Sequence, residues 1–509
     1  MSDQIYPTAR GIDGAVPRDV VAPRFRWPPV IITVLAILGC VAIGVAAGNR
    51  PLIAIIGLVA VLLAIASVVR PEVATFIVIF ILYSNAAVVA VTQFGLPAFF
   101  GAVVPMILVV PLGYELLIRR QIVVITPAVP WLVAFLLVQI LGTLFARDMA
   151  SATDELVTFL LEGIGLYLLI INVVRTPPQM RYVIWTLLAV GIFLGGLSVF
   201  QAATGTYTNP YFGFGLSDAT NDNGITVAGL HRLAGPIGER NRYAQVMLML
   251  VPLALFQAWS EKRRILRLTA YLSAVLCSGA VILTFSRGAA VGFAMVILIM
   301  TLLRYIKPIQ LFLVGLLAVG MLIAVPQYLD RLNTLTAIVS TVTNGDSGST
   351  ADNSILSRAT ENLAALYAFA DHPIIGVGPG QFSSYYRQYA DEVAIVVKAQ
   401  DREAHNLYLA MAADTGILGL ACFMMILFVT LWQLAKGRRR WLGKRTDLAN
   451  MCTAFSLSVV TYMTTGIFLH LSYERYFYLM MALAGAAAYM ALREPDPDSL
   501  LQDVPAGRL

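Results

Sequence analysis

The feature that most constrains the fold of this chain is a series of apolar blocks, each close to 20 residues long. An α-helix rises 1.5 Å per residue, so one such block matches the ~30 Å hydrocarbon core of a bilayer. Only 13% of the 509 residues are charged, which is about half the share found in a soluble domain. The sequence therefore predicts an all-α polytopic membrane protein.

The blocks predict about fourteen transmembrane helices, within a range of about 12 to 14. They cover approximately residues 28–48, 51–69, 73–94, 99–118, 128–146, 156–174, 182–202, 243–260, 268–285, 288–304, 309–327, 406–434, 448–469 and 475–492. Lys and Arg are enriched in cytoplasmic loops of membrane proteins, and here they gather in alternate loops, for example at 262–264 and 436–445. This bias predicts that both termini lie in the cytoplasm.

The predicted domain organisation alternates helical regions with two long outer segments. Residues 1–27 are polar and lack a signal-peptide cleavage pattern, so they are expected to form a disordered cytoplasmic tail. The remaining regions are transmembrane helices at 28–202, an outer loop at 203–242, transmembrane helices with an SRG turn at 243–327, a large extracytoplasmic (periplasmic) loop at 328–404, transmembrane helices at 405–492 and a cytoplasmic tail at 493–509.

Residues 328–404 are predicted to form a small helical cap, because loops this long are usually functional or disordered and this one has a helical pattern. A first helix is expected at about 355–370, with Asn353 or Ser354 as its N-cap. After a Pro/Gly-rich turn, a second helix is expected through 385–397. The apolar face expected for the first helix consists of Ile355, Leu356, Leu363, Leu366 and Phe369.

Arginines on the outer face are candidate anion-binding groups, because the planar guanidinium fork suits phosphate oxygens. Arg287 lies in TFSRGAA, a break of about two residues between two apolar blocks. A charge at helix-end depth without a local partner indicates a functional site. Its neighbours Ser286 and Gly288 let backbone N–H groups at the next helix start approach an anion. Four other arginines are instead expected to contact lipid headgroups or to form loop salt bridges: Arg240, Arg242, Arg331 and Arg402.

His405 is the candidate base. With Asn406 it forms a polar pair at the start of the block 406–434, where it can meet both water and a lipid-linked substrate. An imidazole titrates near neutral pH and can accept a proton from a hydroxyl nucleophile. The alternative is a hydrogen-bonded ring at a helix cap, and Asn406 is expected to orient that ring or to cap the helix. The other histidines are expected to be structural: His231, His372 and His470.

The remaining polar groups carry weaker signals. Glu162 lies inside a predicted span and must be paired or face a cavity, and structural pairing is favoured. Arg475 opens the last block and can be neutralised by its neighbour Glu474. The four cysteines lie in apolar blocks without a CxxC pattern. Neither an HExxH motif nor an acidic cluster in the outer loops indicates a metal site, so no cofactor is expected, and the cap is too acidic to suggest nucleic acid as a partner.

Five motifs occur between residues 230 and 430: RLAGPIGERNRYAQ at 232–245, TFSRGAAVGF at 284–293, SRATENLAAL at 357–366, HPIIGVGPGQF at 372–382 and AHNLYLAMAADTGILGL at 404–420. Each motif alone is weak. Together, and in this order, they resemble the O-antigen ligase and Wzy-type polymerase superfamily, which are bacterial membrane glycosyltransferases that use polyprenyl-diphosphate-linked glycans.

The resemblance implies a metal-independent, inverting glycosyltransferase of the bacterial inner membrane with an extracytoplasmic active face. It implies that Arg232 and Arg287 hold the diphosphate and that His405 assists the acceptor hydroxyl. Further contacts with the diphosphate or the glycan are expected from Arg358, Ser286, Asn241, Asn406 and Arg475. The implied partners are an undecaprenyl-diphosphate-linked glycan donor, a glycan or lipid acceptor, membrane lipids, and polysaccharide-assembly proteins such as a flippase or a chain-length regulator.

Two questions stay open at this level. The sequence does not separate ligation to a lipid from polymerisation of repeat units, exopolysaccharide assembly or protein glycosylation. A flippase or transporter of the same lipid-linked glycan is the alternative from another class. A transporter would place charged residues near mid-membrane on broken helices, whereas most charge here is predicted at one face, with Glu162 as the main exception.

Overall fold

The computed structural model describes residues 70–97, 99–218, 231–312, 315–316, 350–393, 402–470 and 474–496. Several predicted segments lie outside these residues. They are the spans at 28–48 and 51–69, most of the span at 309–327, the N-terminal tail at 1–27 and the C-terminal tail after residue 496. The chain divides into two compact units, one made of Met1–Ala74 with Val110–Ile122 and the other of Thr75–Val109 with Val123–Leu509.

Helices dominate the described residues. In chain order the elements are α3 (Pro71–Tyr83), α4 (Ala86–Phe94), α5 (Phe99–Met106), α6 (Val109–Gly113), the π-helix η1 (Tyr114–Ile118), α7 (Val129–Leu144), α8 (Met149–Thr158), the π-helix η2 (Phe159–Gly165), α9 (Leu166–Val173), α10 (Pro177–Thr204), the 3₁₀ turn η3 (Tyr211–Gly213), β1 (Leu216–Asp218) and β2 (Arg232–Gly235). They continue with α11 (Arg240–Ser260), α12 (Arg264–Leu283), α13 (Arg287–Leu302), α16 (Thr350–Asp371), α17 (Phe382–Val393), α18 (Leu407–Trp441), α19 (Thr446–Thr465), the 3₁₀ turn η4 (Gly466–Phe468) and α20 (Glu474–Arg493).

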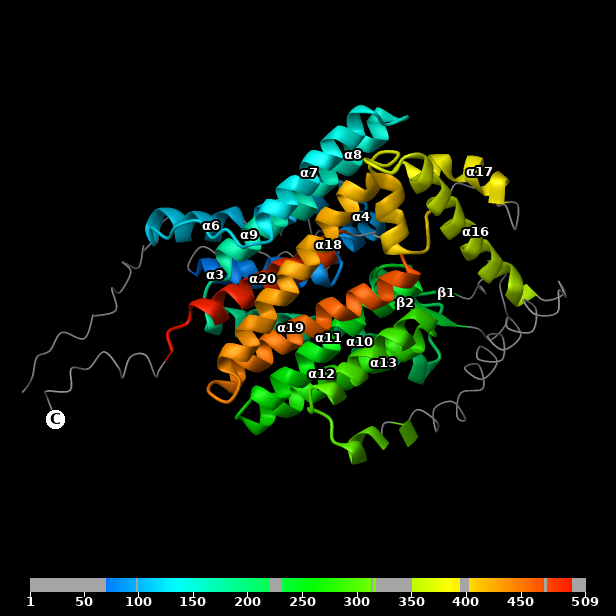
Figure 1. Ribbon diagram of the computed structural model, residues 1–509. Coiled ribbons are helices and arrows are strands. Elements are labelled where there is room, and N and C mark those ends of the chain that lie inside the picture. The colour runs from blue at the N-terminus through cyan, green and yellow to red at the C-terminus, as the bar shows by residue number, and fades with distance from the viewer. Residues whose placement is uncertain are drawn as a thin grey trace, which may run out of the picture. The chain divides into compact units, whose positions relative to one another are not determined.

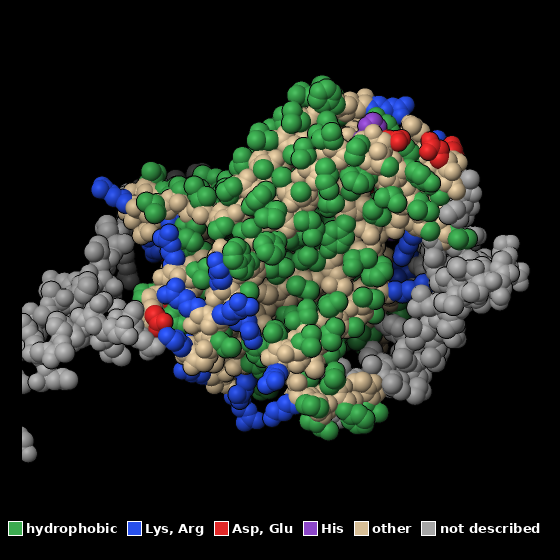
Figure 2. Space-filling model, viewed as in Figure 1, with side chains coloured by type: hydrophobic (Ala, Val, Ile, Leu, Met, Phe, Trp, Pro, Cys, Tyr) green, Lys and Arg blue, Asp and Glu red, His purple; other side chains and the backbone are tan. Residues whose placement is uncertain are grey.

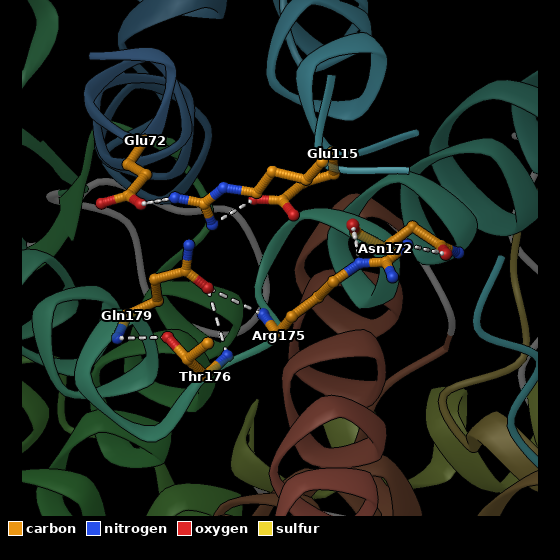
Figure 3. A network of polar contacts seen from close by, with 7 residues as sticks. Glu72, Glu115, Asn172, Arg175, Thr176 and Gln179 are labelled. Carbon is orange, nitrogen blue, oxygen red and sulfur yellow. Dashed lines mark hydrogen bonds and ion pairs between the residues drawn. The ribbon is translucent and has the colours of Figure 1, made fainter. Parts of the chain in front are cut away.

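The smaller unit is held at its described residues by one arginine between two carboxylates. Arg119 lies 2.9 Å from Glu115, one turn earlier in the chain, and 3.4 Å from Glu72 (Figure 3). The Glu115 side chain is buried, and a buried carboxylate requires a partner to offset the loss of its hydration. The ion pair therefore ties the start of α3 to η1.

Seven helices of the described residues are long and apolar enough to cross a membrane, or eight if the bent pair α3 and α4 counts as one span. The seven cover Met149–Val173, Pro177–Thr204, Arg240–Ser260, Arg264–Leu283, Leu407–Trp441, Thr446–Phe468 and Arg475–Arg493. Each coincides with one of the predicted apolar blocks, so the prediction of a polytopic helical membrane protein is confirmed. The count of about fourteen stays a prediction.

The helices of the larger unit differ in how deeply they lie within it. α11 packs against α10, α12, α13 and α19, and 83% of its apolar window is buried, against 33% for α12. Leu268, Leu272 and Val275 form an exposed stripe along α12, which in a membrane protein faces lipid. Hydrophobic side chains cover most of the visible face of α12, α13, α18 and α19, with Lys and Arg gathered at one end (Figures 1 and 2).

The boundaries of α10 follow from local capping. Thr176 and Gln179 form a reciprocal capping box at its start (Figure 3). Gly205 ends the helix with φ 67°, a conformation that favours glycine. Just before the box, Asn172 bonds the backbone of Val124 through both ends of its amide. These contacts fix the turn between α9 and α10.

The expectation of an all-α chain needs one correction. In the segment predicted as an outer loop, β1 and β2 pair antiparallel, with Ser217 opposite Leu233 and Asp218 opposite Arg232. All four residues of β2 are buried, so their backbone groups need partners that water cannot supply. The β1–β2 ladder provides these partners, and β2 is followed in the chain by α11.

The two helices predicted within 328–404 are present as α16 and α17, but their details differ, and their place in an extracytoplasmic cap stays a prediction. α16 begins at Thr350 and not after Asn353 or Ser354, because neither residue type disfavours a helix interior enough to stop it. The expected apolar face is not the face that packs: Leu356, Leu363 and Leu366 are exposed. The buried face of α16 instead carries Ser357, Thr360, Glu361, Ala364, Ala365 and Ala368. Small side chains let α16 pack closely on α17 and α18 (Figure 1).

α18 is broken near its start, and the cap binds to the break. Gly416 has φ 63° and ψ −168° inside the helix. The segment after α16 lies along this break, where Val377 and Gly378 donate backbone hydrogen bonds to Ala413 and Asp414, and Ile417 donates to Pro373. A Cβ on Gly416 would stand 2.3 Å from the carbonyl group of Ile374. Glycine is therefore required for this close approach.

Candidate functional site

His405 lies two residues before the first residue of α18. The next residue, Asn406, is the N-cap, and its side-chain oxygen accepts hydrogen bonds from the backbone N–H groups of Tyr408 and Leu409 at 2.9 and 3.2 Å. This satisfies donors that a helix start otherwise leaves open. The expectation that Asn406 caps the helix is confirmed.

The imidazole of His405 lies against a buried carboxylate that the sequence analysis did not single out. Its Nδ1 is 2.7 Å from Oε2 of Glu361, although the pair does not meet the angles of a hydrogen bond. The Glu361 side chain is only 2% exposed. Its other oxygen accepts a hydrogen bond from Ser357 at 3.2 Å and lies 3.9 Å from Nε of Arg402. The cap helix therefore supplies a charged neighbour to the candidate base.

A second histidine borders His405 on the other side. The His405 and His470 rings are 6.1 Å apart at 75°, and Arg242 donates a 2.6 Å hydrogen bond to the backbone carbonyl of His470. Arg242 also donates to Gln245, which anchors it within α11. Burial, followed by the charges of Arg242 and His405, lowers the pKa of His470 to about 3. His470 is thus a neutral imidazole at physiological pH.

The predicted SRG turn is present, and it places Arg287 at the first position of α13. Ser286 is the N-cap, and its hydroxyl accepts a hydrogen bond from the N–H of Ala289. Phe285 has φ 53°, an uncommon conformation that needs support from the surrounding structure. Arg232 supplies it, because its guanidinium donates to the carbonyls of Thr284 and Phe285 at 3.1 and 3.2 Å.

Arg232 and Arg287 therefore occupy different positions. Arg232 is 2% exposed and bonds the backbone of the turn, whereas Arg287 lies at a helix N-terminus, where the helix dipole favours an anion. The structure assigns Arg232 a bracing contact. The prediction that it touches the diphosphate stays untested.

The starts of α13 and α18, which adjoin the SRG turn and His405, both contact η4. A Cβ on Gly288 would lie 3.1 Å from Phe468, and one on Gly466 would lie 2.9 Å from Leu407. Tyr408 also donates a hydrogen bond to the carbonyl of Met463 near the end of α19. The starts of α13 and α18 are therefore packed on the same turn, which leads directly to His470.

Other predicted site residues have structural partners. Asn241 bonds through its side chain and its backbone to Glu239, the N-cap of α11. Arg358 lies on α16, one turn before Glu361. Arg475 donates to Asn85 at 2.7 Å and lies 3.5 Å from Glu162. The expected structural pairing of Glu162 is confirmed.

The other polar residues considered in the sequence have partners in part. Arg240 pairs with Asp218 at 2.5 Å, the loop salt bridge that was expected, and Arg331 lies outside the described residues. His231 stacks on Tyr207 at 4.4 Å, and His372 contacts Tyr385 edge-on. Within the described ranges, no group of three or more His, Cys, Asp or Glu residues could hold a metal ion.

One further titratable group lies beside the site. The Glu403 carboxyl has its pKa raised to about 7, mainly by burial and then by the negative charge of Glu155, while His405 acts to lower it. It precedes His405 by two residues in the chain. Near pH 7 this segment therefore holds a carboxyl group that changes its charge.

Residues 272–424 match the protein-family model described as O-antigen ligase. This segment resembles an O-antigen ligase domain. The match supports the resemblance to the O-antigen ligase and Wzy-type superfamily that the motifs predicted. The matched segment begins within α12 and ends within α18, so it contains Arg287, Glu361 and His405 but begins after Arg232. A search of curated proteins finds no significant match.

Glu361 was missed because the first helix of the predicted cap was assigned the wrong face. A signal for it exists in the sequence: Ser357, Ala364 and Ala368 recur at helical spacing on both sides of Glu361. A glutamate in the middle of a small-residue face is buried if that face packs, and buried charges need partners.

Proposed function

We propose that this protein is a membrane glycosyltransferase that acts in surface polysaccharide biosynthesis. It transfers or polymerises glycan from an undecaprenyl-diphosphate donor onto an acceptor hydroxyl at the outer face of the inner membrane. The observation that carries the proposal is the match of residues 272–424 to the O-antigen ligase model, together with the packing of the starts of α13 and α18 on the same turn, η4. The residues of the five sequence motifs supply the groups that such a reaction needs.

In the proposed reaction, the acceptor oxygen attacks the anomeric carbon while the bond from that carbon to the diphosphate breaks. The proton of the acceptor hydroxyl passes to His405, and undecaprenyl diphosphate leaves with both bonding electrons. Arg287 at the start of α13 stabilises the charge that develops on the diphosphate. Attack opposite the leaving group inverts the anomeric configuration, and no metal takes part.

Several predicted groups complete the substrate site in this proposal. Arg358, Ser286, Asn241, Asn406 and Arg475 are the proposed further contacts with the diphosphate or the glycan. The lipid tail lies against apolar outer faces of the helices, such as the exposed stripe of α12. The outer surface carries the site, and both termini are cytoplasmic.

Transport of the same lipid-linked glycan is the second candidate, and one observation favours it. α3 and α4 are bent by 59° at Asn85, and Asn85 contacts Arg475, which pairs with Glu162. Broken helices with buried polar groups are typical of transporters. In this structure the polar groups at the break bond to one another. The same contacts would be present if the network only stabilised the fold.

An assay on purified protein in liposomes distinguishes the two candidates. With an undecaprenyl-diphosphate glycan and an acceptor, we expect release of undecaprenyl diphosphate in step with glycan transfer. Arg287→Ala should slow transfer by about 10²-fold or more, as expected for loss of a charge-stabilising donor. Arg445→Ala, at the N-cap of α19 beyond the opposite end of α18, is the matched control. Movement of the lipid across the bilayer without release of undecaprenyl diphosphate would exclude the transferase.

A further inference from the structure

The cap helix α16 carries one charged side chain on a face otherwise made of small or hydroxyl residues. Glu361 is 1% exposed, and its neighbours on that face are Ser357, Thr360, Ala364 and Ala365. Burial of a carboxylate is costly unless hydrogen bonds and opposite charges replace its lost hydration. A leucine or alanine at this position would pack without that cost. A buried glutamate at this position therefore indicates that its carboxylate interacts with another group.

Arg402 alone does not account for the burial of the Glu361 carboxylate. Arg402 lies 3.9 Å from Oε1 of Glu361, at the outer limit for an ion pair, and it is one third exposed. Ser357 donates a hydrogen bond to the same oxygen. Oε2 is thereby left facing His405, whose Nδ1 is 2.7 Å away. The shortest contact of this carboxylate is with the imidazole.

The exposure of His405 shows which side of the ring can meet a substrate. The side chain keeps 25% of its surface exposed, yet its Nδ1 atom is buried against Glu361. The exposed part of the ring therefore belongs to its other atoms. A carboxylate at Nδ1 favours the tautomer with the proton on Nδ1, which leaves Nε2 as the proton acceptor.

We propose that Glu361 is the positioning residue of His405: it fixes the imidazole orientation and tautomer so that Nε2 faces the acceptor hydroxyl. The inference rests on the proposed transferase activity. It adds a role for the cap, because α16 lies more than 30 residues before α18 in the chain and yet supplies the partner of its candidate base. The base is complete only when α16 is packed on the start of α18 through Ala364, Ala368, Ala410 and Ala413.

The test compares Glu361→Gln and Glu361→Asp with Glu392→Gln, which changes an exposed carboxylate on the second cap helix, α17. Glutamine keeps the shape of the side chain but removes its charge, whereas aspartate keeps the charge on a shorter chain. We expect Glu361→Gln to lower kcat by about 10- to 1,000-fold, because loss of the carboxylate partner leaves the histidine in the wrong tautomer or orientation. The KM for the lipid donor should change less than about twofold, since the diphosphate contacts are not touched.

Glu361→Asp should recover part of the lost kcat, and Glu392→Gln should match wild type. The thermal unfolding midpoint of each variant separates a positioning role from a structural one. A fall in kcat that merely follows the loss of folded protein, in both Glu361 variants, would overturn the inference, as would a Glu361→Gln enzyme with wild-type kcat. If wild type itself transfers no glycan, the proposed function fails. If wild type is active, His405→Ala is inactive and Glu361→Gln is normal, only the positioning role fails.

Discussion

At its C-terminal end, α18 carries a basic last turn, where Arg440 and Trp441 donate to backbone carbonyls at the end of α20. Just beyond it, Arg445, the N-cap of α19, pairs with Glu494. At the N-terminal end of α18, the charges are fewer and deeper, with Glu361 buried beside His405. Exposed pairs contribute little to stability and are screened by salt, whereas a buried pair is sensitive to loss of either partner. Burial, rather than the number of charges, distinguishes the end that holds the candidate site.

The largest difference between the two ends should appear in activity. His405→Ala should reduce glycan transfer by about 10²- to 10⁴-fold, the usual contribution of a general base. His372→Ala, in the exposed turn after α16, is the matched control and should retain wild-type activity. Transfer is measured as release of undecaprenyl diphosphate. Equal rates for His405→Ala and His372→Ala would remove His405 from the mechanism.

Two glycines allow the same comparison for stability. Gly416 and Gly443 both have positive φ, but a Cβ on Gly416 would meet the backbone of Ile374 at 2.3 Å, while one on Gly443 would meet nothing within 4 Å. Gly416→Ala should therefore destabilise the protein by several kcal/mol, and Gly443→Ala by only the strain of about 1–2 kcal/mol. Thermal unfolding in detergent measures both. Equal losses would show that the cap segment does not bind tightly at the break.

The carboxyl of Glu403 should give the candidate-site end a pH dependence that the basic end lacks. Its folded-state pKa of about 7 lies above the ordinary value of 4.5, so the folded state binds more protons between these values. The contribution of this group to stability is then greatest below about pH 4.5 and is lost as pH rises through about 7. Glu403→Gln should remove that decline, so its unfolding midpoint should exceed that of wild type increasingly from pH 5 to pH 8. Parallel curves would contradict this, and Glu392→Gln is the control.

The smallest effect is expected at the basic end. Arg445 pairs with Glu494 at 2.7 Å and with Asp447 at 2.9 Å, but about a third of its side chain is exposed. Arg445→Ala should cost less than about 1 kcal/mol and leave transfer unchanged. High salt should reduce even that difference, which a salt titration of the unfolding midpoint checks. A loss of transfer in this variant would show that the two ends are coupled.

Local patterns predicted the membrane helices and the SRG turn because both signals lie within short stretches of sequence. The apolar block at 182–202 became Pro177–Thr204, and the break at TFSRGAA became the start of α13. The pairing of Glu361 with His405 could not be predicted in this way, since it joins residues 44 positions apart and depends on which face of α16 packs. The bracing of the SRG turn by Arg232 is equally non-local, because it needs β2 and the end of α12 to be adjacent.

The break in α18 also limits how this chain can exchange parts with related proteins. The segment at 373–378 and residues 413–417 share backbone hydrogen bonds, so the segment after α16 and the start of α18 form one hydrogen-bonded unit. A chimera that transplants only the loop between its two flanking helices would separate these partners. The smallest exchangeable piece is the cap together with the first turns of α18. Engineers who graft specificity from one relative to another should therefore cut within the membrane helix, after Leu418, and not at the loop boundary.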